Sequence, residues 1–286
     1  MRMKSESLLT QTQKLLRRYD LRARKGLGQH FLIDEDILRL IIDTAQLTAE
    51  DVVIEVGPGL GVLTRELAEH AGRVVAIELD DKLAQILKES LSGAKNVTII
   101  NQDVLKIDPA ALMHDVGSTA YKVVANLPYY ITSPVLRHFL EAEIKPQSMV
   151  VMVQKEVAEE IAAKPGKMSL LSIGVQLYGE PFIVAKVPAE SFYPAPAVDS
   201  AVLKVTPYAK PPIEIADTEG FFRLARAGFS AARKQLANSL AKGMGISKEE
   251  TLALLAKADI SSQRRAETLS IEEWARLWRV HSGAKD

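Results

Sequence analysis

Hydrophobic positions between residues 52 and 153 follow two patterns in turn: continuous runs of β-branched residues, and stretches with the spacing of an amphipathic helix. The runs predict buried strands at 52–56, 73–79, 96–100, 122–126 and 149–153. The stretches predict helices at 62–70, 81–91 and 133–141, the last with Ser133 as N-cap and Pro134 at the first helical position. Strands that alternate with helices are typical of an α/β domain on a parallel sheet.

The pattern changes after residue 205. Residues 169–179 predict a further helix and 201–205 a further strand, but 206–212 contain three prolines in seven residues, which continue neither a helix nor a central strand. We place a domain boundary there. The predicted organisation is a basic N-terminal segment over 1–25, a catalytic α/β domain over 26–208 and a smaller all-helical, RNA-binding domain over 209–286.

The predicted helical domain carries two local signals. Two Ser-x-x-Glu sequences, at 247–250 and 270–273, have the spacing of capping boxes. Trp274 and Trp278 are four residues apart and share one face of a helix, so we expect them in the core of this domain rather than on a surface that stacks bases.

The formal net charge of the 286-residue chain is zero, but the charges are unevenly distributed. Residues 1–30 hold eight basic and two acidic residues, residues 219–286 hold twelve and eight, and the residues between hold 16 and 26. This asymmetry favours a polyanionic partner bound near both ends, with ordinary solvated helix faces as the alternative.

Cysteine is absent from the sequence, which excludes disulfides, thiolate metal sites and a cysteine nucleophile. No segment approaches the roughly 20 apolar residues of a membrane span, and the first residues include no apolar run of signal-peptide length. We expect a cytoplasmic protein with no membrane partner.

The first predicted strand ends in a glycine-rich turn, with Gly57, Gly59 and Gly61 in G-x-G-x-G spacing. Glycine lets the backbone approach a ligand without an intervening Cβ. A dinucleotide fingerprint would have a glycine at position 62, which is Val62, so the turn departs from that pattern. On this motif alone, a structural turn and a nicotinamide cofactor remain alternatives.

Two carboxylates end the next two predicted strands. Glu78 follows the glycine turn by about 20 residues, where a carboxylate can accept both ribose hydroxyl protons, and Asp103 ends the third strand. Ligands of open parallel sheets bind outside the carboxyl ends of the strands, so Gly57, Glu78 and Asp103 should converge on one adenosine. Each acid taken singly could instead be a helix N-cap.

The fourth strand runs into Asn126-Leu127-Pro128-Tyr129, the most informative tetrapeptide of the chain. The exocyclic amine of adenine is a poor nucleophile, so an enzyme must hold its N–H groups in well-placed acceptors. Asn126 offers a side-chain carbonyl, and Leu127, held extended by Pro128, offers a backbone carbonyl. Tyr129 supplies an aromatic face for the base. The alternative is a strand-end turn with only local structural roles.

A second aromatic and proline cluster, at 192–200, precedes the strand at 201–205. Phe192 could clamp the other face of the base, with the prolines stiffening the loop, or it could pack within the loop.

These motifs resemble those of the ribosomal RNA adenine N6-dimethyltransferase family, most closely its bacterial small-subunit (16S) branch. The matching segments are GLGQHFL (26–32), EVGPGLG (55–61), IELD (77–80), QD (102–103), NLPYY (126–130) and FYPAPAVDS (192–200). The resemblance implies a Rossmann-like class I S-adenosylmethionine methyltransferase fold, with that co-substrate and no metal. It implies a cofactor site formed by His30, Leu32, Gly57, Gly59, Glu78, Asp103 and Asn126, and a target adenine held between Tyr129 and Phe192.

One residue departs from the family pattern, because the family often has asparagine where this chain has His30. A backbone contact with the cofactor is still implied there, while a side-chain contact stays open. The implied substrate is a pair of adjacent adenosines in the 3′-terminal hairpin loop of small-subunit ribosomal RNA within a maturing subunit, and we expect a monomer. Alternatives are a large-subunit ribosomal RNA methyltransferase of the antibiotic-resistance type, a DNA adenine methyltransferase, or a non-catalytic ribosome-assembly factor.

Residues 221–242 contain basic residues and no acidic residue. If this segment is one helix, three arginines share a face with a lysine beside it, and this face should contact RNA phosphates. The expected RNA-binding residues are Arg223, Arg226, Arg233 and Lys234.

Overall fold

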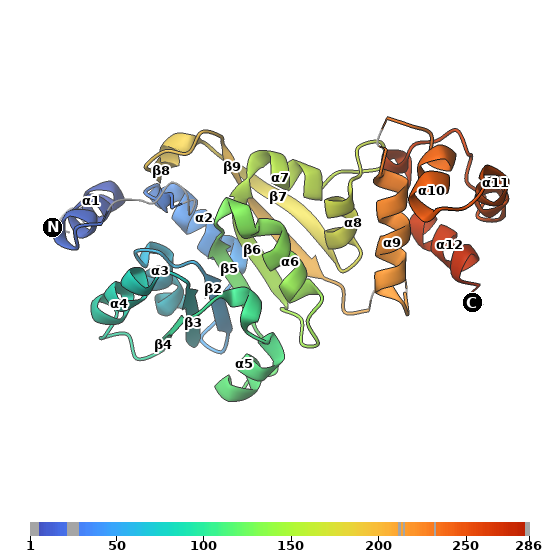
Figure 1. Ribbon diagram of the computed structural model, residues 1–286. Coiled ribbons are helices and arrows are strands. Elements are labelled where there is room, and N and C mark those ends of the chain that lie inside the picture. Colours follow the sequence, from blue (N-terminus) through green and yellow to red (C-terminus); the bar gives the residue numbers. More distant parts are fainter. Residues whose placement is uncertain (1–5, 22–28, 211–212, 214, 232, 284–286) are drawn as a thin grey trace. The chain divides into compact units, whose positions relative to one another are not determined.

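The computed structural model describes residues 6–21, 29–210, 213, 215–231 and 233–283 (Figure 1). The chain forms two compact units. The first, which we call the sheet unit, consists of Met1–Ala158 and Pro181–Pro207, and the second, the helical unit, consists of Glu159–Glu180 and Tyr208–Asp286.

The sheet unit is built on strands in the order β4-β3-β2-β5-β6-β9-β7. Their bounds are β2 (Val52–Val56), β3 (Arg73–Glu78), β4 (Val97–Asn101), β5 (Lys122–Asn126), β6 (Ser148–Gln154), β7 (Gly179–Val187) and β9 (Ser200–Pro207). β2 to β6 run parallel, and β9 pairs antiparallel with β6. All six predicted strands are present, and five of them form the predicted parallel sheet. The sixth, β9, is antiparallel to β6, and β7, which the sequence did not predict, lies beside β9.

Helices connect the strands as the alternating pattern predicted (Figure 1). The helices that begin in the sheet unit are α1 (Leu8–Arg18), α2 (Glu35–Ala45), α3 (Val62–His70), α4 (Asp81–Ser90), α5 (Pro109–Val116), α6 (Thr132–Leu140) and α7 (Lys155–Ile161). The predicted cap of α6 is wrong: Ser133 lies inside the helix, and Ile131 is the N-cap. The reason is a 3-10 turn over Tyr129–Ile131, in which the Ile131 N–H already donates to the Pro128 carbonyl at 3.1 Å.

A two-stranded sheet joins distant parts of the sheet unit. β1 (Phe31–Leu32) pairs antiparallel with β8 (Phe192–Tyr193), in the register Phe31 to Tyr193 and Leu32 to Phe192. The backbone N–H of Ile33 extends this ladder to the Ser191 carbonyl at 2.9 Å. Two motifs far apart in the sequence are therefore held side by side.

The helical unit contains α8 (Leu170–Gln176), α9 (Thr218–Phe229), α10 (Leu236–Met244), α11 (Lys248–Lys257) and α12 (Ile271–Ser282). The domain boundary drawn from the sequence left Glu159–Glu180 with the sheet. In the structure, the backbone N–H groups of Gly166 and Met168 donate to the Glu267 carbonyl at 2.8 and 3.1 Å, and Ile173 packs in the apolar core of the helical unit. These contacts attach the segment to the helical unit.

Two local predictions for the helical unit are confirmed. Both capping boxes are formed, at the N-termini of α11 and α12. Trp274 and Trp278 lie in the core, with Trp274 stacked on Phe229 at a ring-centroid distance of 5.6 Å.

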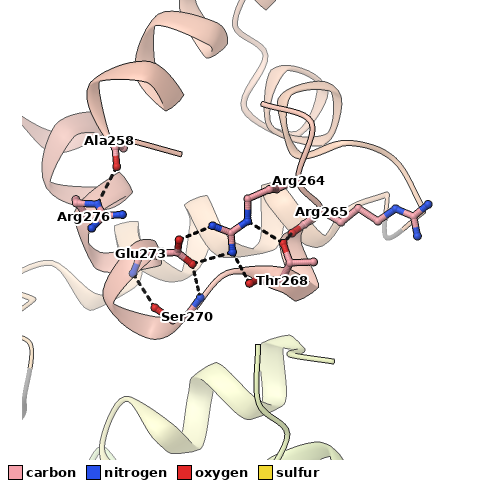
Figure 2. A network of polar contacts seen from close by, with 7 residues as sticks. All are labelled: Ala258, Arg264, Arg265, Thr268, Ser270, Glu273 and Arg276. Carbon is pink, nitrogen blue, oxygen red and sulfur yellow. Dashed lines mark hydrogen bonds and ion pairs between the residues drawn. The ribbon is translucent and has the colours of Figure 1, made fainter. Parts of the chain in front are cut away.

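The second capping box belongs to a polar network (Figure 2). Arg264 pairs with both carboxylate oxygens of Glu273 and donates to the Thr268 carbonyl. The Ser270 backbone N–H donates to the same carboxylate at 2.8 Å. This network joins the loop before α12 to its first turn, and the hydrogen bonds from Arg264 lower the pKa of Glu273.

The condition that residues 221–242 form one helix is not met, because α9 ends at Phe229 and α10 begins at Leu236. Ser230 caps the first helix, and its hydroxyl donates to the Ala227 carbonyl at 2.8 Å. Arg233 and Lys234 therefore lie in the connection between the helices and share no helical face with Arg226. Among the described residues, no helix is long and apolar enough to cross a membrane.

Candidate cofactor and base site

A cavity of about 560 Å³ lies at the carboxyl ends of the parallel strands. Its volume is within the range of small-molecule sites, and its position beside neighbouring β2 and β5, where the strand order reverses, is the expected ligand crevice of such a sheet. All the residues predicted for the cofactor line it: His30, Leu32, Gly57, Gly59, Glu78, Asp103 and Asn126.

The glycine turn adopts a backbone that favours glycine. Gly57 and Gly59 have φ values of +66° and +59°. A Cβ at Gly57 would lie 3.3 Å from the Pro128 ring, and one at Gly59 would lie 3.2 Å from the Phe31 ring. Gly57 and Gly59 thus line the cavity with backbone alone, and the Gly59 N–H donates to Oε2 of Glu78 at 3.1 Å.

The carboxylate of Glu78 is buried and held in a fixed orientation. Its Oε2 accepts from Gly59, and its Oε1 accepts from the Asp80 N–H at 2.9 Å. Burial raises the pKa of Glu78, partly offset by these bonds. Each oxygen keeps a second lone pair for a hydroxyl donor, which suits a pair of ribose hydroxyls.

Asp103 combines the two roles considered for it. Its Oδ1 accepts from the Leu105 N–H at 3.0 Å and caps a 3-10 turn, and the side chain also lines the cavity. Capping and ligand binding are compatible, because a carboxylate has more acceptor positions than one cap uses.

Glu55 and Tyr130 are among the cavity-lining residues that were not predicted from the sequence. Glu55 is 1% exposed, and burial raises its pKa to about 8, so its carboxyl group is largely protonated at neutral pH. The sequence feature that could have indicated Glu55 is its place as the single acidic residue of an otherwise apolar strand. Tyr130 is 55% exposed beside Glu78 and Asp103, and only its place next to Tyr129 could have indicated it.

The NLPY turn closes one side of the cavity. Nδ2 of Asn126 donates to the His30 carbonyl at 3.1 Å, which leaves Oδ1 as the acceptor of that amide. The Leu127 N–H donates to the Met152 carbonyl of β6 at 3.1 Å, and the Leu127 side chain is buried. Both residues are therefore held by segments outside the turn, Asn126 by the residue just before β1 and Leu127 by β6.

The ring of Tyr129 is held at two points. Its hydroxyl lies 2.7 Å from Oγ of the buried Ser200, and burial raises its pKa. Its ring stacks with the His30 imidazole at a centroid distance of 5.8 Å and an interplanar angle of 21°. The ring lines the cavity in this orientation.

Phe192 is not among the residues that line the cavity. Its side chain is 2% exposed and packs in an apolar cluster with Leu32 and residues of the sheet. The structure therefore places Tyr129, but not Phe192, where a base could stack. The pairing of β8 with β1 directs the Phe192 side chain into this cluster.

The four basic residues predicted to bind RNA are exposed in the helical unit, but they differ in their surroundings. Arg223 pairs with Glu219 at 2.9 Å and lies 3.8 Å from Asp217. Arg226 is on α9, and Arg233 and Lys234 follow it in the connection to α10. Among the described residues, no group of three or more His, Asp or Glu side chains gathers as a metal site would require.

Similar proteins have consistent names. A family model described as ribosomal RNA adenine dimethylase matches residues 20–281. "Ribosomal RNA small subunit methyltransferase A" of Dehalococcoides mccartyi is 53% identical over 276 residues, which cover 96% of this chain and 94% of that protein. The protein of the same name from Enterococcus faecalis is 46% identical, covering 94% and 93%.

Two solved structures extend the comparison. The 23S rRNA methyltransferase ErmE is 30% identical with a TM-score of 0.69, covering 87% of this chain and 98% of its own. A dimethyladenosine transferase from Plasmodium falciparum is 26% identical with a TM-score of 0.73, covering 87% and 96%.

Proposed function

Because the chain belongs to the ribosomal RNA adenine dimethylase family, we propose that it methylates the N6 amines of two adjacent adenosines in the 3′-terminal hairpin loop of small-subunit ribosomal RNA. Family membership confirms the predicted enzyme class, an S-adenosylmethionine-dependent dimethyltransferase, and the predicted Rossmann-like class I fold. The observation that carries the proposal is the NLPY turn at the same cavity as Glu78 and Asp103.

The cavity fits S-adenosylmethionine. The glycine turn leaves room for a ligand beside the backbone, Glu78 offers acceptors for ribose hydroxyls, and Asp103 offers a further acceptor. The bound cofactor supplies a methyl group on a positively charged sulfur, which is already activated for transfer. The protein therefore needs to position the amine rather than to generate a reactive group, and positioning can lower a barrier by up to roughly 7–11 kcal/mol.

Asn126 and Leu127 are the residues we propose to position the amine. Oδ1 of Asn126 and the carbonyl of Leu127 would each accept an N–H of the target amine, which favours a pyramidal nitrogen with its lone pair free. The bond from Nδ2 to the His30 carbonyl supports this role, because it fixes which end of the amide can accept. Pro128 sets the backbone direction of the turn.

Tyr129 is the residue we propose to stack on the adenine. Stacking on an aromatic ring contributes about 1–3 kcal/mol per base, and the bond to Ser200 holds the ring before the base arrives. Phe192 supports the wall from behind through its packing with Leu32. Tyr129→Ala should thus weaken use of RNA by roughly 5- to 150-fold while the dissociation constant of S-adenosylmethionine changes little, as steady-state kinetics and calorimetry would measure.

The remaining features follow the same proposal. We propose that Arg226, Arg233 and Lys234, with a smaller contribution from the paired Arg223, contact RNA phosphates. We propose a cytoplasmic monomer that acts on maturing small subunits, on the ground of the family resemblance.

The test is a set of parallel incubations with labelled S-adenosylmethionine and, as substrate, small subunits that lack the modification, large-subunit RNA or DNA, followed by mapping of the methylated nucleotides. Two adjacent dimethyladenosines in the 3′-terminal hairpin are expected. Label in large-subunit RNA alone would favour the antibiotic-resistance type of enzyme, and label in DNA alone a DNA methyltransferase. Binding without transfer would favour an assembly factor. Each of these outcomes would overturn the proposal.

A further inference from the structure

The imidazole of His30 contacts Tyr129, the residue proposed to stack on the target base. Its ring stacks on Tyr129 with centroids 5.8 Å apart, and its Nδ1 lies 2.7 Å from the Pro194 carbonyl oxygen. Its backbone carbonyl accepts from Asn126. One residue thus touches two members of the NLPY turn and the chain that follows β8.

The contact with Pro194 lies just beyond the β1–β8 ladder. The register pairs Leu32 with Phe192 and Phe31 with Tyr193, so His30 and Pro194 come one position after the last paired residues. The bond from the His30 side chain to the Pro194 carbonyl therefore joins the two chain segments at the end of the two-stranded sheet.

This hydrogen bond also determines where the ring carries a proton. A carbonyl oxygen only accepts, so Nδ1 must donate, whether the ring is neutral or charged. The contact therefore holds in either charge state, and the ring stays in one orientation against Tyr129.

We propose that the His30 side chain is a positioning residue for Tyr129, with its effect on base binding rather than on cofactor affinity. The stack and the bond to Pro194 keep the Tyr129 ring and the end of β8 in place before the target adenine enters. This inference rests on the proposed function in one respect, the assignment of base stacking to Tyr129. It also gives a role to the side chain at position 30, where family members often have asparagine and where the sequence left a side-chain contact with the cofactor open.

Two variants separate the two contacts of the side chain. His30→Asn keeps an amide that can donate to Pro194 but removes the ring, and His30→Phe keeps a ring but removes the donor. His30→Ala removes both. His70→Ala is a matched control, because Nδ1 of the exposed His70 also lies 2.8 Å from a backbone carbonyl, that of Glu66, away from the cavity.

The first measurement is the division of the effect between cofactor and RNA. His30→Ala should lower kcat/KM for the RNA substrate about tenfold or more, with the dissociation constant of S-adenosylhomocysteine within twofold of wild type. His30→Asn and His30→Phe should each recover part of this loss, and His70→Ala should match wild type. A tenfold weaker cofactor affinity with unchanged RNA kinetics at saturating cofactor would overturn the proposal, as would wild-type behaviour of His30→Ala.

The second measurement does not depend on activity. RNA hairpins with 2-aminopurine at the target position report base stacking by quenching of fluorescence, and this base has no N6 amine to methylate. Quenching in the complex should be weaker with His30→Ala than with wild type, and His30→Ala should add nothing in a Tyr129→Ala background. Equal and additive losses in both backgrounds would refute positioning through Tyr129. Failure of the proposed function would appear differently, as a wild-type enzyme that methylates neither adenosine.

Discussion

Replacing Asn126 with alanine tests the central step of the proposed chemistry. In the structure, Nδ2 of Asn126 is bound to the His30 carbonyl at 3.1 Å, and Oδ1 is the end of the amide left to accept from the adenine amine. Alanine removes both interactions, but it leaves the glycine turn, Glu78 and Asp103 unchanged.

The two losses have different sizes and different readouts. Loss of the bond to His30 should lower the free energy of unfolding by about 0.5–1.5 kcal/mol, as for a typical hydrogen bond. Loss of the acceptor acts on the transition state, where removal of one preorganised group typically lowers kcat about 10²–10³-fold. Because the other cofactor contacts remain, the affinity for S-adenosylmethionine should fall by less than about tenfold, or 1.4 kcal/mol.

The assay is single-turnover methylation of unmodified small subunits with both substrates saturating, together with calorimetry for cofactor affinity. Asn96→Ala is the matched control, since Nδ2 of Asn96 donates to the Ala68 and Ala71 carbonyls at 2.9 and 3.0 Å away from the cavity. It should lower stability and leave the rate unchanged. Normal turnover of Asn126→Ala at saturation, with tenfold weaker cofactor binding, would refute the reasoning and reduce Asn126 to a cofactor ligand.

Three further outcomes are expected. Phe192→Ala should lower the free energy of unfolding by about 3–5 kcal/mol, because it empties a buried aromatic position; a fully stable variant with impaired RNA use would instead return Phe192 to the base site. Arg226→Glu with Arg233→Glu should weaken RNA binding and reduce the slope of log affinity against log salt by roughly 0.7–0.9 per lost phosphate contact, and an unaltered slope would assign these contacts elsewhere. Arg264 lowers the pKa of Glu273, so the stability from this pair is complete above the unfolded-state pKa of the carboxyl and is lost as the pH falls through its lower folded-state pKa. Unfolding followed by tryptophan fluorescence should therefore show a steeper loss of stability toward acid pH in wild type than in Glu273→Gln, and equal slopes would contradict the assignment.

The central sheet could be predicted from the sequence because its strands are buried on both faces. Runs such as Val52–Val56 are almost wholly apolar, and such runs are typical of buried parallel strands when helices alternate with them. The positions of Glu78 and Asp103 followed from topology alone, since the ends of neighbouring parallel strands share one edge. The same reasoning could not predict that Tyr130 lines the cavity, because its position depends on the 3-10 turn after Pro128.

Charge and helical periodicity were weaker guides in the helical unit. Residues 221–242 are compatible with a continuous amphipathic helix, but the Ser230 hydroxyl caps α9 and α10 starts afresh at Leu236. The absence of acids within the segment also concealed Glu219, which lies one helical turn before Arg223 and pairs with it. The charge pattern of 221–242 therefore omitted an ion-pair partner that lies two residues before the segment. An arginine that has no acidic neighbour in a short segment is thus weak evidence of a phosphate contact.

At the proposed base site, the contact partners lie even farther outside any local sequence window. His30 and Pro194 are 164 residues apart, and the strands that bring them together contain only two residues each. Strands this short have no periodicity that a sequence pattern could detect. Yet their register decides that Phe192 packs inward and that the His30 ring lies against Tyr129. The NLPY motif indicates the proposed chemistry, whereas the contact between its tyrosine and His30 depends on this short ladder. Substitutions at His30 should therefore change the proposed base stacking without changing any residue of the motif.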